Sequence, residues 1–359
     1  METNNAARTV DVIIPARNEE DCLGRCLQSL VAQQGISFQI TVVDDGSTDR
    51  TRAIAESFSG VRAGVRVMTA GELRPGMMGK VNALVTGAAG SSAEWLLFTD
   101  ADTFHYPGSL AASVREAEDR KVDLLSYSPE QETGSWWELA VMPLVFADLV
   151  RTYSSERIND PADPTVAANG QYILVRREVY EALGGHATLP FNILEDVELA
   201  RIFKASDHRI WFRYGGGLVR TRMYRTFGAM WEGWSKGLAI LFRRPVLLAA
   251  RRALEFVSIA VLLGTGLVMM AQNQFESAAV PLAIAALFYL IFLFRIRQAH
   301  FPWRANLMAF IGLPIYVSLL LRSHLHLNRR GELRWKGRMY SQSAPKAADG
   351  SSIRKGDLS

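Results

Sequence analysis

The chain has 359 residues and a formal net charge of +4; 49% of its residues are hydrophobic and 21% are charged. This length accommodates one large domain or two ordinary ones. The modest charge, without any recognised nucleic-acid-binding motif, argues against nucleic acid as a partner. The apolar residues are unevenly distributed: the first two thirds read as a globular α/β chain, whereas the composition after about Arg251 is typical of membrane spans.

Short apolar segments alternate with helical patterns along the first part of the chain. Strands are predicted at 9–14, 38–43, 65–68, 95–98, 122–126 and 172–176. Asn18 is expected to cap the first helix, which Gly35 closes. This alternation of strands and helices indicates an α/β fold with a mostly parallel sheet covered by helices.

Three of these strands end in polar loops that carry carboxylates, at 15–19, 44–49 and 100–102. Parallel α/β sheets bind ligands beyond the carboxyl ends of their strands, which meet at one edge. Each loop by itself could simply cap the helix that follows it. Three such loops at one edge predict a single binding site.

Asp100 and Asp102 follow directly after the buried strand 95–98. Two hard oxygen ligands at this spacing suit Mg²⁺ or Mn²⁺ held together with the phosphates of a substrate. An isolated Asp-x-Asp is more often a solvated turn, so the surrounding residues must support the interpretation. Neither a P-loop nor a Gly-x-Gly-x-x-Gly follows the first strand. A nucleotide diphosphate would therefore be held by acidic groups and a divalent cation.

Five motifs follow one another in the order found in a known family. They are Val12-Ile13-Ile14-Pro15-Ala16-Arg17-Asn18-Glu19, Val43-Asp44-Asp45-Gly46-Ser47-Thr48-Asp49, Gly79-Lys80-Val81-Asn82-Ala83-Leu84, Asp100-Ala101-Asp102 and Leu194-Glu195-Asp196. Through them the chain resembles the family 2 glycosyltransferases of the GT-A fold, over residues 10 to about 235. The resemblance implies a nucleotide-sugar donor such as a UDP-hexose, and a mixed, mostly parallel sheet.

The resemblance also implies roles on the donor side of the site. By this resemblance, we expect Pro15, Ala16, Glu19 and Asp45 around the base and ribose and Lys80 near the donor. We expect Asp102, with Asp100, at the metal and diphosphate.

On the acceptor side, the resemblance implies that Asp196 is the general base and that Glu195 supports it. Acidic residues at a helix start usually just complement the helix dipole. The chemistry nevertheless needs such a group, because an acceptor hydroxyl is a poor nucleophile until a carboxylate removes its proton. Attack from the face opposite the leaving diphosphate then inverts the configuration of the sugar.

The family's next element is often Gln-x-x-Arg-Trp, and here the Gln and the Trp are missing from the stretch 219–225. Because processive synthases use that motif to hold a polymer, its loss favours transfer of a single sugar. Arg222 and Arg225 are the candidates to contact the diphosphate, and contact with lipid headgroups is the alternative. The stretch 230–237 resembles the interfacial helix of membrane glycosyltransferases that act on carotenoids, hopanoids or sphingolipids.

Trp136 and Trp137 open an amphipathic stretch that runs to Tyr153. Paired tryptophans suit a membrane interface, stacking on a sugar or lipid, or packing in a core. The residues alone leave these three interpretations open.

Three apolar runs, at 256–271, 277–294 and 306–321, are predicted to span a membrane. The loop 272–276 has no Lys or Arg and should lie outside, whereas Arg295 and Arg297 place the next loop inside. The N-terminal domain would then be cytoplasmic. Three spans would send the basic C-terminal tail outside, against the charge rule. Either Gly312-Leu313-Pro314 breaks the third run into a re-entrant hairpin, or 238–250 enters the membrane.

The sequence thus predicts a GT-A domain at 1–235, with a nucleotide-sugar half at 1–103 and an acceptor half at 104–235. Interfacial and transmembrane helices follow at 236–341 and a disordered tail at 342–359. The predicted protein is a multi-pass, metal-dependent inverting glycosyltransferase of the cell membrane, acting on a lipid or other membrane-associated hydroxyl. A processive polysaccharide synthase and an inactive membrane scaffold are the alternatives. The sugar, the acceptor and the oligomeric state stay open.

Overall fold

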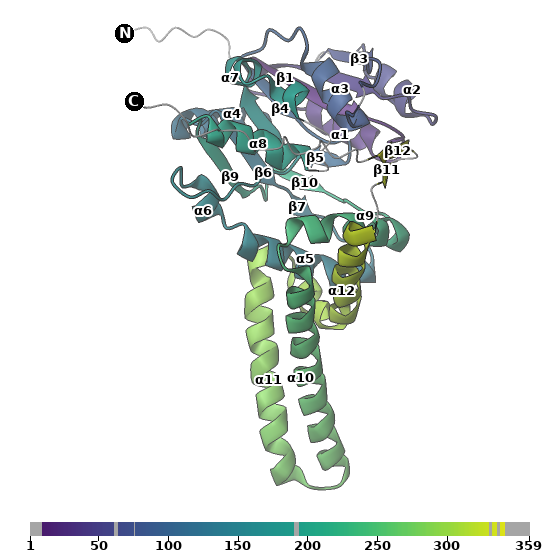
Figure 1. The fold of residues 1–359 in the computed structure, drawn as a ribbon, viewed down its shortest axis with the longest axis vertical. Helices are drawn as coiled ribbons and strands as arrows, with labels where there is room; N and C mark the ends of the chain where they lie inside the picture. The colour runs from purple at the N-terminus through teal and green to yellow at the C-terminus, as the bar shows by residue number, and fades with distance from the viewer. Residues whose placement is uncertain are drawn as a thin grey trace, which may run out of the picture.

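The computed structural model describes residues 9–60, 64–74, 76–189, 194–329, 332–335 and 338–341. An α/β domain sits above a long helical hairpin (Figure 1). The expected disordered tail at 342–359 lies outside the described residues.

The elements of the α/β domain follow in chain order. They are β1 (Thr9–Ala16), α1 (Leu23–Val31), β2 (Ser37–Asp44), α2 (Thr51–Glu56), β3 (Val65–Thr69), α3 (Gly79–Ala88), β4 (Trp95–Phe98), β5 (Thr103–His105), α4 (Ser109–Arg120), β6 (Leu124–Ser128), β7 (Glu130–Gln131), α5 (Trp136–Thr152), α6 (Ser155–Asn159), β8 (Ile173–Arg176), α7 (Arg177–Ala182), the 3-10 helix η1 (Gly185–Thr188), α8 (Glu195–Ala205), β9 (Ile210–Tyr214), β10 (Val219–Thr221) and α9 (Phe227–Leu241). The remainder of the described chain forms α10 (Pro245–Ala271), α11 (Phe275–Ile296), the 3-10 helix η2 (Arg297–Ala299), α12 (Trp303–Arg329), β11 (Glu332–Trp335) and β12 (Arg338–Ser341).

The main sheet has seven strands in the order β3-β2-β1-β4-β8-β6-β9. β1 is parallel to both β2 and β4, whereas β8 is antiparallel to its neighbours β4 and β6. Six strands therefore run one way and only β8 runs the other way, which confirms the expected mixed, mostly parallel sheet. A small sheet of β5, β10 and β7 flanks it.

Both faces of the main sheet are covered by helices, because alternate side chains of a strand point to opposite faces. On β1, Val12 and Ile14 pack with α1 and α4, whereas Ile13 packs with α3 and α8. All three side chains are fully buried. Because both faces of this strand are buried, its sequence is a nearly continuous apolar run instead of an alternating one.

The direction of β8 decides what lies at the carboxyl edge of the parallel strands. The loops after β1, β2 and β4 emerge there, as the sequence predicted. Because β8 runs against them, the segment before it, Asn169-Gly170-Gln171, emerges at the same edge. Residues from both halves of the domain therefore share one rim.

Asn18 does not cap the first helix, which begins only at Leu23. It adopts a left-handed backbone conformation with φ of 54°. Its Oδ1 accepts a hydrogen bond of 2.9 Å from the backbone N–H of Thr48. The side chain thus joins the first two rim loops instead of starting a helix, a conformation that Asn tolerates better than most residues.

Helices α5, α9, α10, α11 and α12 share a third apolar core beneath the sheet. Trp137 is buried in this core, whereas Trp136 is 58% exposed. The helix α5 begins with a capping box, in which the Glu138 side chain accepts from the backbone N–H of Ser135. The domain boundary expected at 235–236 falls inside α9, and α5 packs in the same core as the apolar helices. The division into domains therefore stays a prediction.

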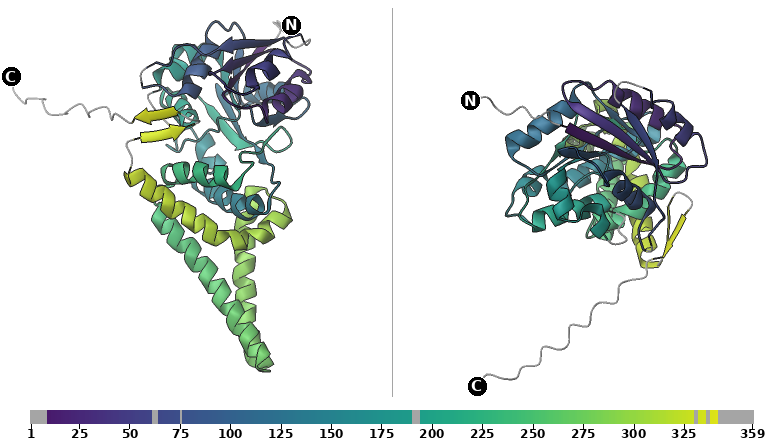
Figure 2. Two further views of the ribbon diagram at one scale, coloured as in Figure 1. Left: turned by 90° about the vertical axis from the view of Figure 1, so that its right-hand side faces the viewer. Right: turned by 90° about the horizontal axis from the view of Figure 1, so that it is seen from above.

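The helices α10 and α11 form a long hairpin that projects away from the α/β domain (Figures 1 and 2). The third apolar helix, α12, lies across the base of the hairpin and packs on α5, α9 and α10. It is continuous from Trp303 to Arg329, so a re-entrant break at Gly312-Leu313-Pro314, the first of the two alternatives for this run, does not occur. A Cβ at Gly312 would collide with the backbone of Ala140, so this glycine instead allows α12 to lie directly on α5.

A buried cluster of charges joins α5, α10, α11 and α12 at the base of the hairpin. Asp148 accepts hydrogen bonds from Arg252, at 2.6 Å and 3.0 Å, and from the Tyr316 hydroxyl at 3.1 Å. Arg295 lies 3.4 Å from Asp148 and 2.9 Å from Glu255. Two positive and two negative groups balance one another, as buried charges require. The cluster ties the hairpin to α5.

Candidate functional site

A cleft of about 1380 Å³ opens along the carboxyl edge of the sheet and extends down between α5 and α9. The cleft is lined by every site residue predicted from the sequence, namely Pro15, Ala16, Glu19, Asp45, Lys80, Asp100, Asp102, Glu195, Asp196, Arg222 and Arg225. Residues as far apart in the chain as Pro15 and Arg225 therefore line one cleft. Their individual roles stay predictions.

The two N-terminal rim loops are held together by backbone contacts. The N–H of Asp45 donates to the Ala16 carbonyl at 2.9 Å. Arg17 donates to the Asp45 carbonyl at 2.5 Å, and its guanidinium lies 3.7 Å from the Asp45 carboxylate. These contacts hold Pro15, Ala16 and Asp45 side by side at the edge of the cleft.

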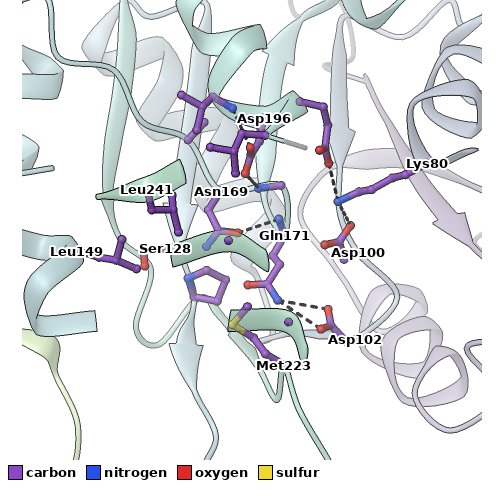
Figure 3. A pocket seen from close by; sticks show the side chains of 18 of the residues that line it. Lys80, Asp100, Asp102, Ser128, Leu149, Asn169, Gln171, Asp196, Met223 and Leu241 are labelled. Atoms are coloured by element: carbon purple, nitrogen blue, oxygen red, sulfur yellow. Dashed lines mark hydrogen bonds and ion pairs between the residues drawn. The ribbon is translucent and has the colours of Figure 1, made fainter. Parts of the chain in front are cut away.

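Lys80, at the start of α3, joins two carboxylates from different parts of the fold (Figure 3). Its Nζ lies 2.8 Å from Asp100 Oδ1, after β4, and 2.9 Å from Glu195 Oε1, at the start of α8. Burial alone would lower the pKa of Lys80, but the two carboxylates raise it well above its usual value. The ammonium group therefore stays charged and links the Asp100 loop to α8.

Asp196 is held by two backbone N–H groups. Gly170 donates to its Oδ2 at 2.9 Å and Val197 to its Oδ1 at 2.8 Å. Burial and the negative charge of Glu195 nevertheless raise the pKa of Asp196 to about 7. A carboxyl group with such a pKa exchanges a proton near neutral pH, which suits a general base.

Several side chains of the site converge on Gly170. A Cβ on Gly170 would lie 3.1 Å from Lys80 Nζ and 3.6 Å from both Asp196 Oδ2 and Glu195 Oε1. The next residue, Gln171, donates from Nε2 to the Asp102 carboxylate at 3.3 Å and 3.5 Å. Asp196 and Asp102 are thus hydrogen-bonded to consecutive residues of one segment, on two sides of the same cleft.

The surroundings of Asp102 fit a divalent cation. Burial, together with the negative charges of Asp100 and Glu19, raises the pKa of Asp102 to about 7. The side-chain oxygen of Gln171 is also buried and accepts no hydrogen bond from the described residues. A cation would relieve this repulsion between carboxylates. No cluster of three or more His, Cys, Asp or Glu side chains able to hold a metal occurs in the described part of the chain. Asp102 and Asp100 would therefore share the ion with phosphates of a ligand.

The two candidate arginines differ in their partners. Arg222 makes a bidentate pair with the buried Glu138, at 3.0 Å and 2.9 Å. Arg225 is exposed, lines the cleft and forms no ion pair with any described residue. Arg225 is therefore the better placed of the two to contact an anionic ligand.

Gln171 is the main contact of the site that sequence reasoning did not assign. The sequence predicted a strand at 172–176 and assigned no role to the residues just before it. The signal that could have found it is the direction of β8, because only an antiparallel strand places its amino end at the carboxyl edge of its neighbours. No local pattern in the sequence shows that direction.

Comparison with known proteins agrees with the family resemblance seen in the sequence motifs. Residues 11–184 match the family model described as glycosyl transferase family 2. The 4,4'-diaponeurosporenoate glycosyltransferase of Staphylococcus aureus (strain USA300) is 28% identical over 346 residues, which cover 94% of this chain and 89% of that protein. Its counterpart from strain MRSA252 is 27% identical over the same shares.

Two solved structures also match this chain. The mannosyltransferase PcManGT from Pyrobaculum calidifontis, in complex with GDP-Man and Mn²⁺, is 17% identical with a TM-score of 0.48, covering 90% of this chain and 88% of its own. Glucosyl-3-phosphoglycerate synthase from Mycobacterium tuberculosis, in complex with Mn²⁺, UDP-glucose and phosphoglyceric acid, is 20% identical with a TM-score of 0.41, covering 67% and 80%.

Proposed function

We propose that this chain, whose residues 11–184 match the family 2 glycosyltransferase model, transfers one hexose, with inversion, from a UDP-linked donor to the hydroxyl of a lipid acceptor. The observation that supports this proposal best is that two carboxylates from distant parts of the chain are hydrogen-bonded to consecutive residues: Gln171 donates to Asp102, and Gly170 donates to Asp196. One carboxylate can serve the donor diphosphate while the other serves the acceptor.

The proposed mechanism uses residues on both sides of the cleft. Asp196 accepts the proton of the acceptor hydroxyl as its oxygen forms a bond to the anomeric carbon. The bond from that carbon to the diphosphate oxygen breaks on the opposite face, and UDP leaves with the bonding electrons. Bound Mg²⁺ or Mn²⁺ at Asp102 and Asp100 would supply Lewis-acid stabilisation of the leaving diphosphate. Arg225 would add a positive charge there.

A lipid acceptor is supported by the relative and by the helical part of this chain. The Staphylococcus aureus relative is named for glycosyl transfer to 4,4'-diaponeurosporenoate. Three helices of this chain, at Pro245–Ala271, Phe275–Ala299 and Trp303–His326, are long and apolar enough to cross a membrane. The cleft descends to the base of these helices, because Ala299 and His300 line it.

We propose further that only α10 and α11 cross the membrane. The exposed apolar side chains of α11 extend from Phe275 to Phe294, a length of about 30 Å at 1.5 Å per residue, which matches the hydrocarbon core. Arg252 and Arg295 lie at the base of the hairpin, whereas the described turn 272–274 carries no Lys or Arg. The charge rule then places the α/β domain on the cytoplasmic side.

The proposed course of α12 along the membrane surface rests on contacts at both of its ends. Just before α12, Phe301 packs on Phe146 of α5, with ring centroids 5.8 Å apart. Near its other end, Ser323 accepts a hydrogen bond of 2.8 Å from the backbone N–H of Ala239 in α9. A helix that begins and ends against the same domain does not cross to the other side. The C-terminal end would then return to the side of the α/β domain, which resolves the charge conflict of three spans.

The role of Asp196 predicts a selective loss of transfer. Asp196→Asn should lower hexose transfer to a lipid extract by about 10²–10⁴-fold, the usual contribution of a general base. Donor binding should change little, because Asp102 and Asp100 remain. Transfer is measured with radiolabelled UDP-glucose, UDP-galactose and GDP-mannose, and lipid products by mass spectrometry. Glu178→Gln makes the same chemical change in the first turn of α7, at an exposed carboxylate that does not line the cleft; it is the control and should keep its activity. Full transfer by Asp196→Asn would contradict the assignment.

The raised pKa of Asp196 predicts an acidic limb in the pH profile. The base must be deprotonated, so kcat/KM for the acceptor should fall as the pH drops below about 7. In Glu195→Gln the limb should move to lower pH, because a neighbouring negative charge that raises the pKa is removed. A limb at the same pH in Glu195→Gln and wild type would assign the titration to another group.

The proposed topology predicts which sites face the cell exterior. In intact cells, a membrane-impermeant maleimide should label Asn273→Cys at the hairpin turn. A cysteine added after Ser359 should be labelled only after permeabilisation. The wild-type chain, with its native Cys22 and Cys26, gives the background. Labelling of the added C-terminal cysteine in intact cells would show that three helices cross.

A further inference from the structure

The cleft has two unlike halves. At the sheet edge it is lined by the carboxylates and Lys80, whereas Leu149 and Leu241 lie on the opposite side of the pocket (Figure 3). Val150 and Ile240 extend this second half. This half carries apolar side chains from two helices and belongs to the same cleft as the charged half, so one elongated ligand could occupy both.

The apolar half has three walls from different parts of the chain. The end of α5 supplies Leu149 and Val150, and the end of α9 supplies Leu241. The turn between α11 and α12 supplies His300. The Tyr153 hydroxyl donates to the Leu241 carbonyl at 2.6 Å, which fixes the spacing between α5 and α9. We call the opening bounded by Leu149, Val150, Leu241 and His300 the portal.

The turn that forms the third wall is anchored to the sheet. His300 stacks flat on Tyr214, with ring centroids 4.2 Å apart and an interplanar angle of 9°. Tyr214 is the last residue of β9, so it lies at the same edge as the carboxylates. His300 has a φ of 60°, a left-handed conformation uncommon for residues other than glycine and typical of places held by their surroundings. The helical hairpin thus contributes a fixed wall to the cleft.

The portal adjoins the base of the apolar hairpin. The helix α11 ends at Ile296, immediately before the turn that carries His300. Val150 is 39% exposed, although it is apolar. An exposed apolar side chain therefore lies at the mouth of the cleft, on the helix α5 that packs against the end of α11 and against η2. A molecule residing in lipid beside the hairpin would meet the cleft there.

We infer that the portal admits the apolar chain of the acceptor directly from the lipid, so that its hydroxyl reaches Asp196 while the chain remains between α5, α9 and the His300 turn. This inference rests on the proposed function, since it names the route to the same site. The occupant is a single apolar chain. The walls that would contact it carry apolar side chains and the stacked rings of His300 and Tyr214, and the cleft continues from there to the carboxylates. Soluble acceptors would gain nothing from these walls.

Photocrosslinking tests the portal independently of turnover. The full chain is placed in phosphatidylcholine vesicles that contain hexadecanol carrying a diazirine on its alkyl chain. After illumination, adducts should map to α5, the end of α9 and the turn at His300. Val150→Trp replaces a small side chain at the mouth by an indole ring and should reduce these adducts at least tenfold. Val246→Trp is the matched control, because Val246 is also apolar and exposed, at 46%, but does not line the cleft.

The outcomes separate the inference from the proposed function. Adducts confined to the lipid-facing sides of α10 and α11, equal in both variants, would overturn the portal. Portal adducts without any hexose transfer by wild-type protein would leave the portal standing and contradict the proposed function. If transfer occurs, Val150→Trp should also raise the KM for long-chain acceptors at least tenfold. The KM for the donor should stay unchanged.

Discussion

The site depends on the ion pairs that the half-buried ammonium group of Lys80 makes with Asp100 and Glu195. Asp100 follows β4 and Glu195 begins α8, so this one side chain joins the two halves of the α/β domain. Without this ammonium group, two carboxylates would face one another in a partly buried place and repel, which is more costly there than in water. Asp102 and Asp196 are neighbours of these residues in the chain. Lys80 therefore also positions the two groups that we assign to the donor and the acceptor.

A second constraint is that the helix α5 both lines the cleft and pairs with the base of the apolar hairpin. Successive residues of this helix face different surroundings: Asp148 pairs with Arg252 in the buried charge cluster, whereas Leu149 and Val150 line the cleft. Removing one partner of such a buried pair usually destabilises strongly. The helix that shapes the acceptor half of the cleft is thus held by the base of the hairpin, and the position of the cleft relative to the lipid follows from that contact.

Much of the α/β domain and its carboxylate-bearing edge could be predicted from local patterns, whereas Lys80, Glu195 and Asp196 were assigned to the site only through the family resemblance. Continuous apolar runs gave β1, β2 and β4, and their parallel direction brought Asp45, Asp100 and Asp102 to one edge. The direction of β8 depends on pairing between distant segments, so the contact of Gln171 with Asp102 was not foreseen. Asn18 was mistaken for a helix cap since its partner, Thr48, lies 30 residues away. For α12, composition alone cannot separate a helix that packs on protein from one that crosses lipid.

The central claim is that Asp102 and Asp196 face one cleft with different roles, the first at the metal and donor diphosphate and the second at the acceptor. Titration of Mn²⁺ in the presence of UDP or GDP, followed by electron paramagnetic resonance, tests this division most directly. Wild type and Asp196→Asn should bind Mn²⁺ with nucleotide equally well, whereas Asp102→Asn should lose this binding. Unchanged Mn²⁺ binding by Asp102→Asn, or no binding by wild type with either nucleotide, would contradict it.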